Sequence, residues 1–146
     1  MMSILANSPT NNSIPGSHHA AELPASHLRD LLPAPPIDRD RLLELCLDNV
    51  EFALVLLQEF ETTSQLRLDG FSTALAQQDS AAIVFKAHAF KGVVSILAAD
   101  ALMATCVNLE AAAKTADWDK TRALVQHLHH EMQRAINFIP NICASP

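Results

Sequence analysis

Apolar side chains recur every three or four residues from Ile37 to Ile139, and this spacing constrains the fold more than any other feature of the chain. Such spacing places apolar residues on one face of an α-helix, whereas a half-buried β-strand requires strict alternation, which is absent. Turn residues are scarce between the apolar segments. The pattern therefore predicts an all-α domain of amphipathic helices joined by very short links.

Aspartates mark the expected helix starts, because a carboxylate there accepts a backbone N–H and complements the helix dipole. These residues are Asp38, Asp48, Asp79, Asp100 and Asp117. The first helix is short and extends through Leu47, and the last should stop at Pro140. The four long helices predict an antiparallel up-down four-helix bundle, with the short extra N-terminal helix covering one end.

Each long helix has one apolar seam that is expected to face the core. In chain order, the seams consist of Ala53, Leu57, Phe60, Ser64, Leu68, Phe71 and Leu75; of Ile83, Ala87, Phe90, Val94 and Leu97; of Leu102, Cys106, Leu109 and Ala113; and of Val125, Leu128, Met132, Ala135 and Ile139.

Residues 1–36 differ in composition from the rest of the chain. They hold six of the eight prolines and show almost no apolar periodicity, which predicts a flexible N-terminal extension before a bundle domain at residues 37–146. Ser26 to Leu32 has the composition of a helical turn or two. The N-terminus lacks the basic start and apolar stretch of a signal peptide, so none is expected.

Charge and cysteine content exclude several classes of function. The net charge is −6 and no cluster of Lys and Arg exists, so nucleic-acid binding is not expected. No uncharged apolar run approaches the roughly 20 residues of a membrane span. Cys46, Cys106 and Cys143 are an odd number and far apart, with no CxxC pair. Cys46 and Cys106 lie among apolar residues and are expected to be small core side chains in a reducing cytoplasm.

The third helix in chain order, counting the short first one, carries the run AHAFKG, in which chemistry is possible. If its seam faces the core, His88 lies on the outer strip of the helix. The residues at offsets of three, four and seven from His88 share this face: Lys91, Gly92 and Ser95. A neutral imidazole is a competent nucleophile near neutral pH, and an ammonium group beside it attracts phosphoryl oxygens. Val84 and Phe85, one turn earlier, offer an apolar rim for a docking partner.

Gly92 is an unfavourable residue in the middle of a segment that otherwise favours a helix. The chain has only three glycines, and a glycine inside a helix costs about 1 kcal/mol relative to alanine. We interpret this glycine as leaving space beside His88, because the absence of a side chain one turn further on lets another protein approach His88 closely.

The stretch AHAFKGVVSILAADALMATCVNLEAAAK resembles the histidine-containing phosphotransfer (HPt) domain, whose usual phrase is AHxLKG, a leucine-glycine step, and then L…C..LE. The resemblance covers Ile37 to Ile139, with Ala98 in place of the usual glycine. It implies that His88 is phosphorylated, with Lys91 and Gly92 in support. It also implies a phosphocarrier in a multi-step two-component phosphorelay, without a cofactor of its own. The implied partners are receiver domains of response regulators and hybrid kinases, which supply Mg²⁺.

Two other functions remain open from the sequence. One is an HPt-like scaffold that binds receivers without phosphate chemistry. The other is a metal-binding bundle, because His127, His130 and Glu131 share a helical face, although HExxH spacing is absent. An autokinase is not expected, since Ala89 follows His88 and no glycine-rich phosphate loop exists. A cytoplasmic monomer that does not bind membranes is the simplest expectation.

Overall fold

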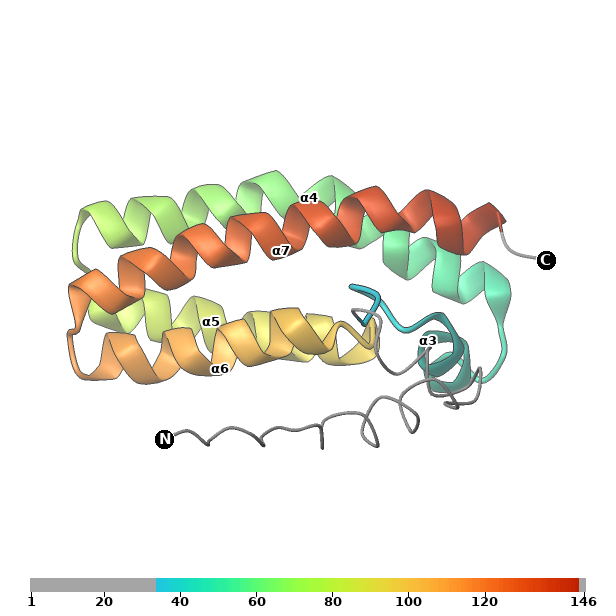
Figure 1. Cartoon of the computed structure of the whole chain (residues 1–146), viewed down its shortest axis with the longest axis horizontal. Helices are drawn as coiled ribbons and strands as arrows, with labels where there is room; N and C mark the ends of the chain where they lie inside the picture. Colours follow the sequence, from blue (N-terminus) through green and yellow to red (C-terminus); the bar gives the residue numbers. More distant parts are fainter. Residues whose placement is uncertain (1–33, 145–146) are drawn as a thin grey trace, which may run out of the picture. The chain divides into compact units, whose positions relative to one another are not determined.

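The computed structural model describes residues 34–144 of the chain, which contain helices and no strand. Five helices follow one another: α3 (Arg39–Leu45), α4 (Val50–Ala76), α5 (Ser80–Ile96), α6 (Asp100–Lys114) and α7 (Trp118–Ala144). The four long helices run up and down as an antiparallel bundle, with α3 lying across the end where α5 stops and α6 begins (Figure 1). This confirms the all-α four-helix-bundle prediction.

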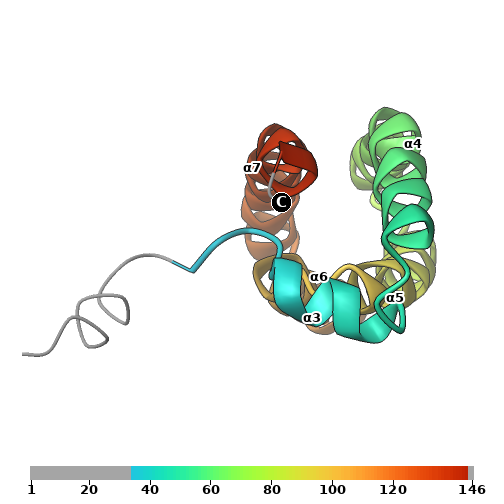
Figure 2. The ribbon, with the colours of Figure 1, turned by 90° about the vertical axis from the view of Figure 1, so that its right-hand side faces the viewer.

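The end-on view shows the order of the helices around the bundle (Figure 2). α5 lies beside α4 and α6, and α7 completes the bundle next to α6 and α4. The predicted seams of α5, α6 and α7 are buried without exception. In α4 the prediction holds except at Leu75, which is half-buried, because Ala74 takes the core position at the end of the helix.

Stacked aromatic rings join α4 to α5 in the core. The rings of Phe60 and Phe90 lie 6.3 Å apart between centroids and nearly parallel, and the guanidinium of Arg67 lies 5.1 Å from the centroid of Phe90. Such contacts add to the stability that apolar burial provides. The seam of α5 is thereby fixed toward α4 and α6, which leaves the opposite strip of α5 outward.

Each link between consecutive long helices has three residues, and all of these links have the same backbone geometry. In each link the middle residue, Gln78, Ala98 or Ala116, has a positive φ between 49° and 57°. The N–H of the third residue then bonds back to a carbonyl five residues earlier, as Ala99 N does to Val94 O at 3.2 Å. Glycine normally occupies this left-handed position at the end of a helix. The geometry therefore accounts for the glycine that the HPt phrase has where this chain has Ala98.

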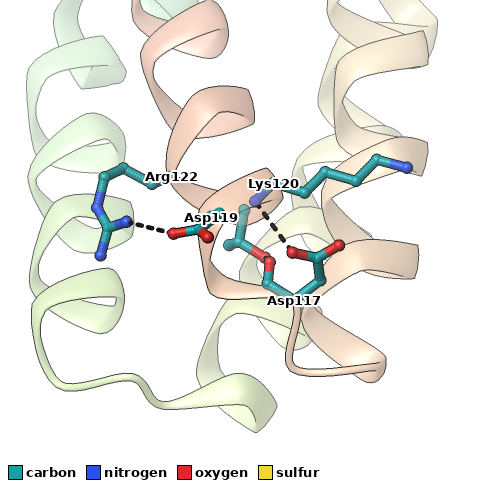
Figure 3. Close-up of polar contacts among 5 residues, drawn as sticks. Asp117, Asp119, Lys120 and Arg122 are labelled. Atoms are coloured by element: carbon teal, nitrogen blue, oxygen red, sulfur yellow. Dashed lines mark hydrogen bonds and ion pairs between the residues drawn. The ribbon is translucent and has the colours of Figure 1, made fainter.

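Three of the predicted aspartate caps are confirmed. Asp38 accepts from Arg41 N, Asp79 from Ala82 N, and Asp117 from Lys120 N. Figure 3 shows the last of these at the start of α7, beside the ion pair of Arg122 with Asp119.

Four expectations about helix ends are wrong. Asn49, and not Asp48, caps α4, because Asp48 has already been turned to φ 61°. Ala99 precedes α6, while the Asp100 carboxylate instead binds Arg41 of α3 at 2.7 Å.

The other two errors concern where α3 and α7 end. α3 ends at Leu45 and not at Leu47, whose φ of 56° is left-handed. α7 continues past Pro140 to Ala144, since proline removes only one hydrogen bond there and Ile142 is buried in the following turn.

The expected flexible extension, residues 1–36, lies outside the described residues except for residues 34–36. None of the helices between residues 34 and 144 combines the length and apolar character that crossing a bilayer requires.

We predict that Gln78→Gly stabilises the bundle by about 0.5 to 1 kcal/mol, because glycine adopts a positive φ without steric cost. Gln78 is exposed, so no packing is lost. The measurement is chemical denaturation. The matched control is Gln77→Gly, at the preceding position with φ −84°, which should not gain stability.

Candidate functional site

The outer strip of α5 carries the expected functional residues. His88 is turned to solvent with its side chain 74% exposed, and Gly92 and Ser95 are also exposed. Lys91 is half-buried, with its ammonium directed toward α6. The predicted exposure of His88 is therefore confirmed, and the three residues lie on one face as their spacing requires.

Glu110 of α6 joins His88 to Lys91. Its Oε1 lies 2.7 Å from Lys91 Nζ, and its Oε2 lies 3.3 Å from His88 Nδ1. The Glu110 side chain is only 14% exposed, because the residue follows the buried Leu109 at the edge of the α6 seam. Both carboxylate oxygens therefore have a nitrogen partner, and the two α5 side chains meet at one acid.

Electrostatics keep this acid ionised. The hydrogen bond and the charge of Lys91 lower the pKa of Glu110, assisted by His88 and opposed by partial burial. An ionised carboxylate accepts hydrogen bonds only, so Oε2 at 3.3 Å interacts favourably with His88 Nδ1 when that nitrogen carries a proton. This contact favours the Nδ1–H tautomer of the neutral ring and leaves the lone pair on Nε2. Among residues 34–144, Nε2 has no hydrogen-bond or ion-pair partner, and the side chain that carries it is 74% exposed.

A buried cysteine lies behind the site. Burial raises the pKa of Cys106 to about 12, with Lys91 lowering it and Glu110 raising it. The thiol is therefore neutral and fully enclosed. It acts as a core side chain, as the sequence suggested, and not as a second nucleophile.

Nothing in the bundle requires glycine at position 92. A Cβ placed on Gly92 would meet no atom within 4 Å outside the local helix backbone. Next to it, the Ser95 hydroxyl donates to Gly92 O at 2.8 Å and so stays within its own helix. The surface one turn beyond His88 is consequently bare backbone, open to an approaching molecule.

The two apolar residues expected at the rim take different positions. Phe85 is 73% exposed, one turn before His88. Val84 is half-buried and packs against the core, so only part of it remains available at the surface.

The histidines of α7 are placed elsewhere in the bundle. The rings of His127 and His130 lie 6.4 Å apart, and Glu131 is buried and bound to Arg134 at 2.8 Å. Among residues 34–144, no three His, Cys, Asp or Glu side chains are grouped so that they could hold a metal ion. Glu131 is thus already engaged with a cation of its own helix.

Comparison with known proteins identifies the class. The sequence model of the Hpt domain matches residues 55–138, which is more than half of the chain. The fold is similar to the crystal structure of histidine-containing phosphotransfer protein B (HptB) from Pseudomonas aeruginosa PAO1, with a TM-score of 0.68 and 29% sequence identity over 78% of this chain and 100% of that chain. A comparison with curated proteins found no match.

The chain therefore belongs to the Hpt domain family, whose members carry phosphoryl groups on histidine in phosphorelays. The expected bundle, the exposed histidine and this family agree. Glu110 has no role predicted from the sequence, although it is the last residue of the L…C..LE phrase. An acidic residue directly after a leucine of the seam indicates a carboxylate at the edge of the core, and this pattern could have drawn attention to Glu110.

We predict that Glu110→Gln destabilises the bundle by about 1 kcal/mol near neutral pH, since it removes the charge that Lys91 binds. The lowered pKa sets the sign with pH. The contribution of the ionised Glu110 to the free energy of unfolding is complete above the ordinary pKa of a glutamate. It is lost as the pH falls through the lowered pKa of Glu110. Thermal melts across the acid range should therefore show the variant and the wild type converging at low pH. A constant difference at every pH would contradict this account.

Proposed function

We propose that this chain relays phosphoryl groups between receiver-domain aspartates in a multi-step two-component phosphorelay, with Nε2 of His88 as the carrier atom. The single observation that carries the proposal is the pairing of His88 Nδ1 with Glu110, which leaves a nucleophilic lone pair on an exposed Nε2. Membership of the Hpt domain family supports the same role.

The transfer step is a displacement at phosphorus. The Nε2 lone pair forms the N–P bond while the bond from phosphorus to the aspartyl oxygen of the receiver breaks, and the aspartate leaves as a carboxylate. The imidazole keeps its Nδ1 proton and gains positive charge as the N–P bond forms. The negative Glu110 at 3.3 Å offsets this charge, and the reverse displacement returns the phosphoryl group to a second receiver.

Lys91 acts at the same site through its ammonium. It is bound to Glu110 at 2.7 Å, so it is held beside His88 before any phosphoryl group arrives. A phosphohistidine has oxygens that compete with Glu110 for this ammonium. We infer that Lys91 shares its hydrogen bonds between the carboxylate and the phosphoryl oxygens once His88 is loaded.

The rest of the chemistry belongs to the partner. The receiver supplies the Mg²⁺ that neutralises phosphoryl charge, and this chain acts as a cytoplasmic phosphocarrier monomer with no kinase or hydrolase activity of its own. Gly92 supports the encounter, because transfer requires the reacting atoms to lie within about 3 to 3.5 Å of each other. A bare turn after His88 allows the active-site surface of a receiver that close.

We predict that His88→Gln abolishes phosphoryl acceptance while changing the free energy of unfolding by no more than about 0.5 kcal/mol, because the side chain is exposed. The experiment incubates wild type and variant with a panel of purified, phosphorylated receiver domains and follows the label. Acid-labile label on the wild type alone is the expected result. A wild type that accepts no label from any receiver, while still binding receivers, would instead indicate a scaffold.

We predict that Gly92→Leu separates stability from transfer. Leucine in a helix interior should raise stability by several tenths of a kcal/mol and up to about 1 kcal/mol. Its side chain meets open space in this protein but stands where a receiver approaches, so transfer should slow on the order of a hundredfold. A melting curve and a transfer time course on one sample measure both effects. Transfer at the wild-type rate would show that clearance is not the reason for glycine.

A further inference from the structure

A groove lies between α4 and α5, on the side of α5 that faces away from Glu110. It is an open hollow of about 350 Å³, at the lower end of the range for ligand pockets. Its apolar lining comes from both helices, with Leu66 76% exposed and Phe85 73% exposed at the surface. Ala89 and the buried Phe71 also line the hollow. Large apolar side chains this exposed, around a hollow, are typical of contact sites for other proteins.

Two cations line the same hollow, Arg67 from α4 and Lys86 from α5. Within residues 34–144, five Arg and Lys side chains form ion pairs with carboxylates, but neither of these two does. Arg67 stacks on Phe90, and its Nε is buried without a hydrogen-bond partner. Within the described part of the chain, no carboxylate compensates the positive charge of the groove, although the net charge of the whole sequence is −6.

Gly70 gives Lys86 its place in the groove. A Cβ on Gly70 would lie 3.1 Å from Lys86 Nζ and 3.5 Å from its Cε. The lysine stem therefore lies across the backbone of α4 and brings its ammonium to the groove. With a side chain at position 70, the ammonium of Lys86 would have to shift by a few tenths of an ångström.

The groove continues into the phosphotransfer site along α5. Phe85 precedes His88 by three residues, and Ala89, which lines the hollow, follows it directly. A partner that reaches Nε2 of His88 therefore covers the groove as well. Since neither cation has a carboxylate partner among residues 34–144, a binding partner with a carboxylate over the groove gains two attractive contacts, and one with a cation there meets repulsion.

We propose that this groove receives an apolar side chain of a receiver domain, that a neighbouring carboxylate of the receiver binds Arg67 and Lys86, and that these two cations determine which receivers exchange phosphate with His88. The proposal rests on the proposed function, since it assigns the partner surface of the same site. It commits to a receiver that carries an acidic residue beside an exposed apolar one.

The test uses the receiver that exchanges phosphate with His88 fastest in the panel described above. Lys86→Gln, Arg67→Gln and their double variant are titrated against this receiver, activated with beryllium fluoride, at low and high salt. The double variant should weaken binding roughly tenfold at low salt, and its affinity should depend less on salt than that of the wild type. Transfer at saturating receiver should stay at the wild-type rate, because neither cation contacts the reacting atoms.

Two controls isolate charge from folding. Lys120→Gln removes one positive charge, as each single groove variant does, but from the exposed start of α7, and it should leave the affinity for the receiver unchanged. Arg67→Lys keeps the charge and should restore most of the affinity that Arg67→Gln loses. A melting curve for each Arg67 variant accounts for its contact with Phe90.

A charge swap then identifies the partner residue. Lys86→Glu should lose affinity, and replacing one receiver carboxylate by lysine should restore it. Unchanged binding by the double variant, together with normal transfer from the wild type, overturns the groove proposal and leaves the proposed function standing. Absence of transfer to the wild type from every receiver overturns the proposed function itself. A wild-type dimer that the double variant abolishes would show a second copy in the groove and would also overturn the proposal.

Discussion

The carboxylate of Glu110 is the interaction on which the candidate site depends. It lies at the edge of the α6 seam, where it is protected from water on one side and meets α5 on the other. One group therefore sets the position of two: it holds the imidazole through Nδ1 and the ammonium of Lys91 through its second oxygen. Without it, His88 would be one exposed rotamer among several, and the lysine charge would have no fixed place. A single acid thus connects the edge of the bundle core to the exposed imidazole of His88.

Most of the fold could be predicted because the helices and their buried faces depend on patterns of residues close together in the sequence. The seams of α5, α6 and α7 follow from apolar spacing alone, and Asp38, Asp79 and Asp117 cap helices because a cap is a contact within one turn. The predictions for Asp100 and Pro140 are wrong for a nonlocal reason. Asp100 is engaged by Arg41 of another helix, and the turn beyond Pro140 is retained because Ile142 packs in the core.

The same distinction divides the site. His88, Lys91 and Gly92 could be found from the sequence because they lie within one and a half turns of a single helix. Glu110 could not be assigned, since its contact depends on how α6 is rotated and shifted against α5. The groove of Arg67 and Lys86 is likewise a property of two helices, and Gly70 acquires its meaning only from the lysine that crosses it. Spacing along the chain identifies the residues of one helix face, and packing decides which of them meet.

The three-residue link between α5 and α6 has a further consequence for how this site can change. With Ala98 left-handed and Ala99 bonded back to Val94, the link has no slack, so α6 leaves it at a fixed rotation about its own axis. Each residue added or removed between Ala98 and Glu110 would turn the carboxylate by about 100° and carry it away from His88. Changes of length in this hairpin would therefore displace the acid, and the count of residues from turn to acid is as much a part of the site as the histidine.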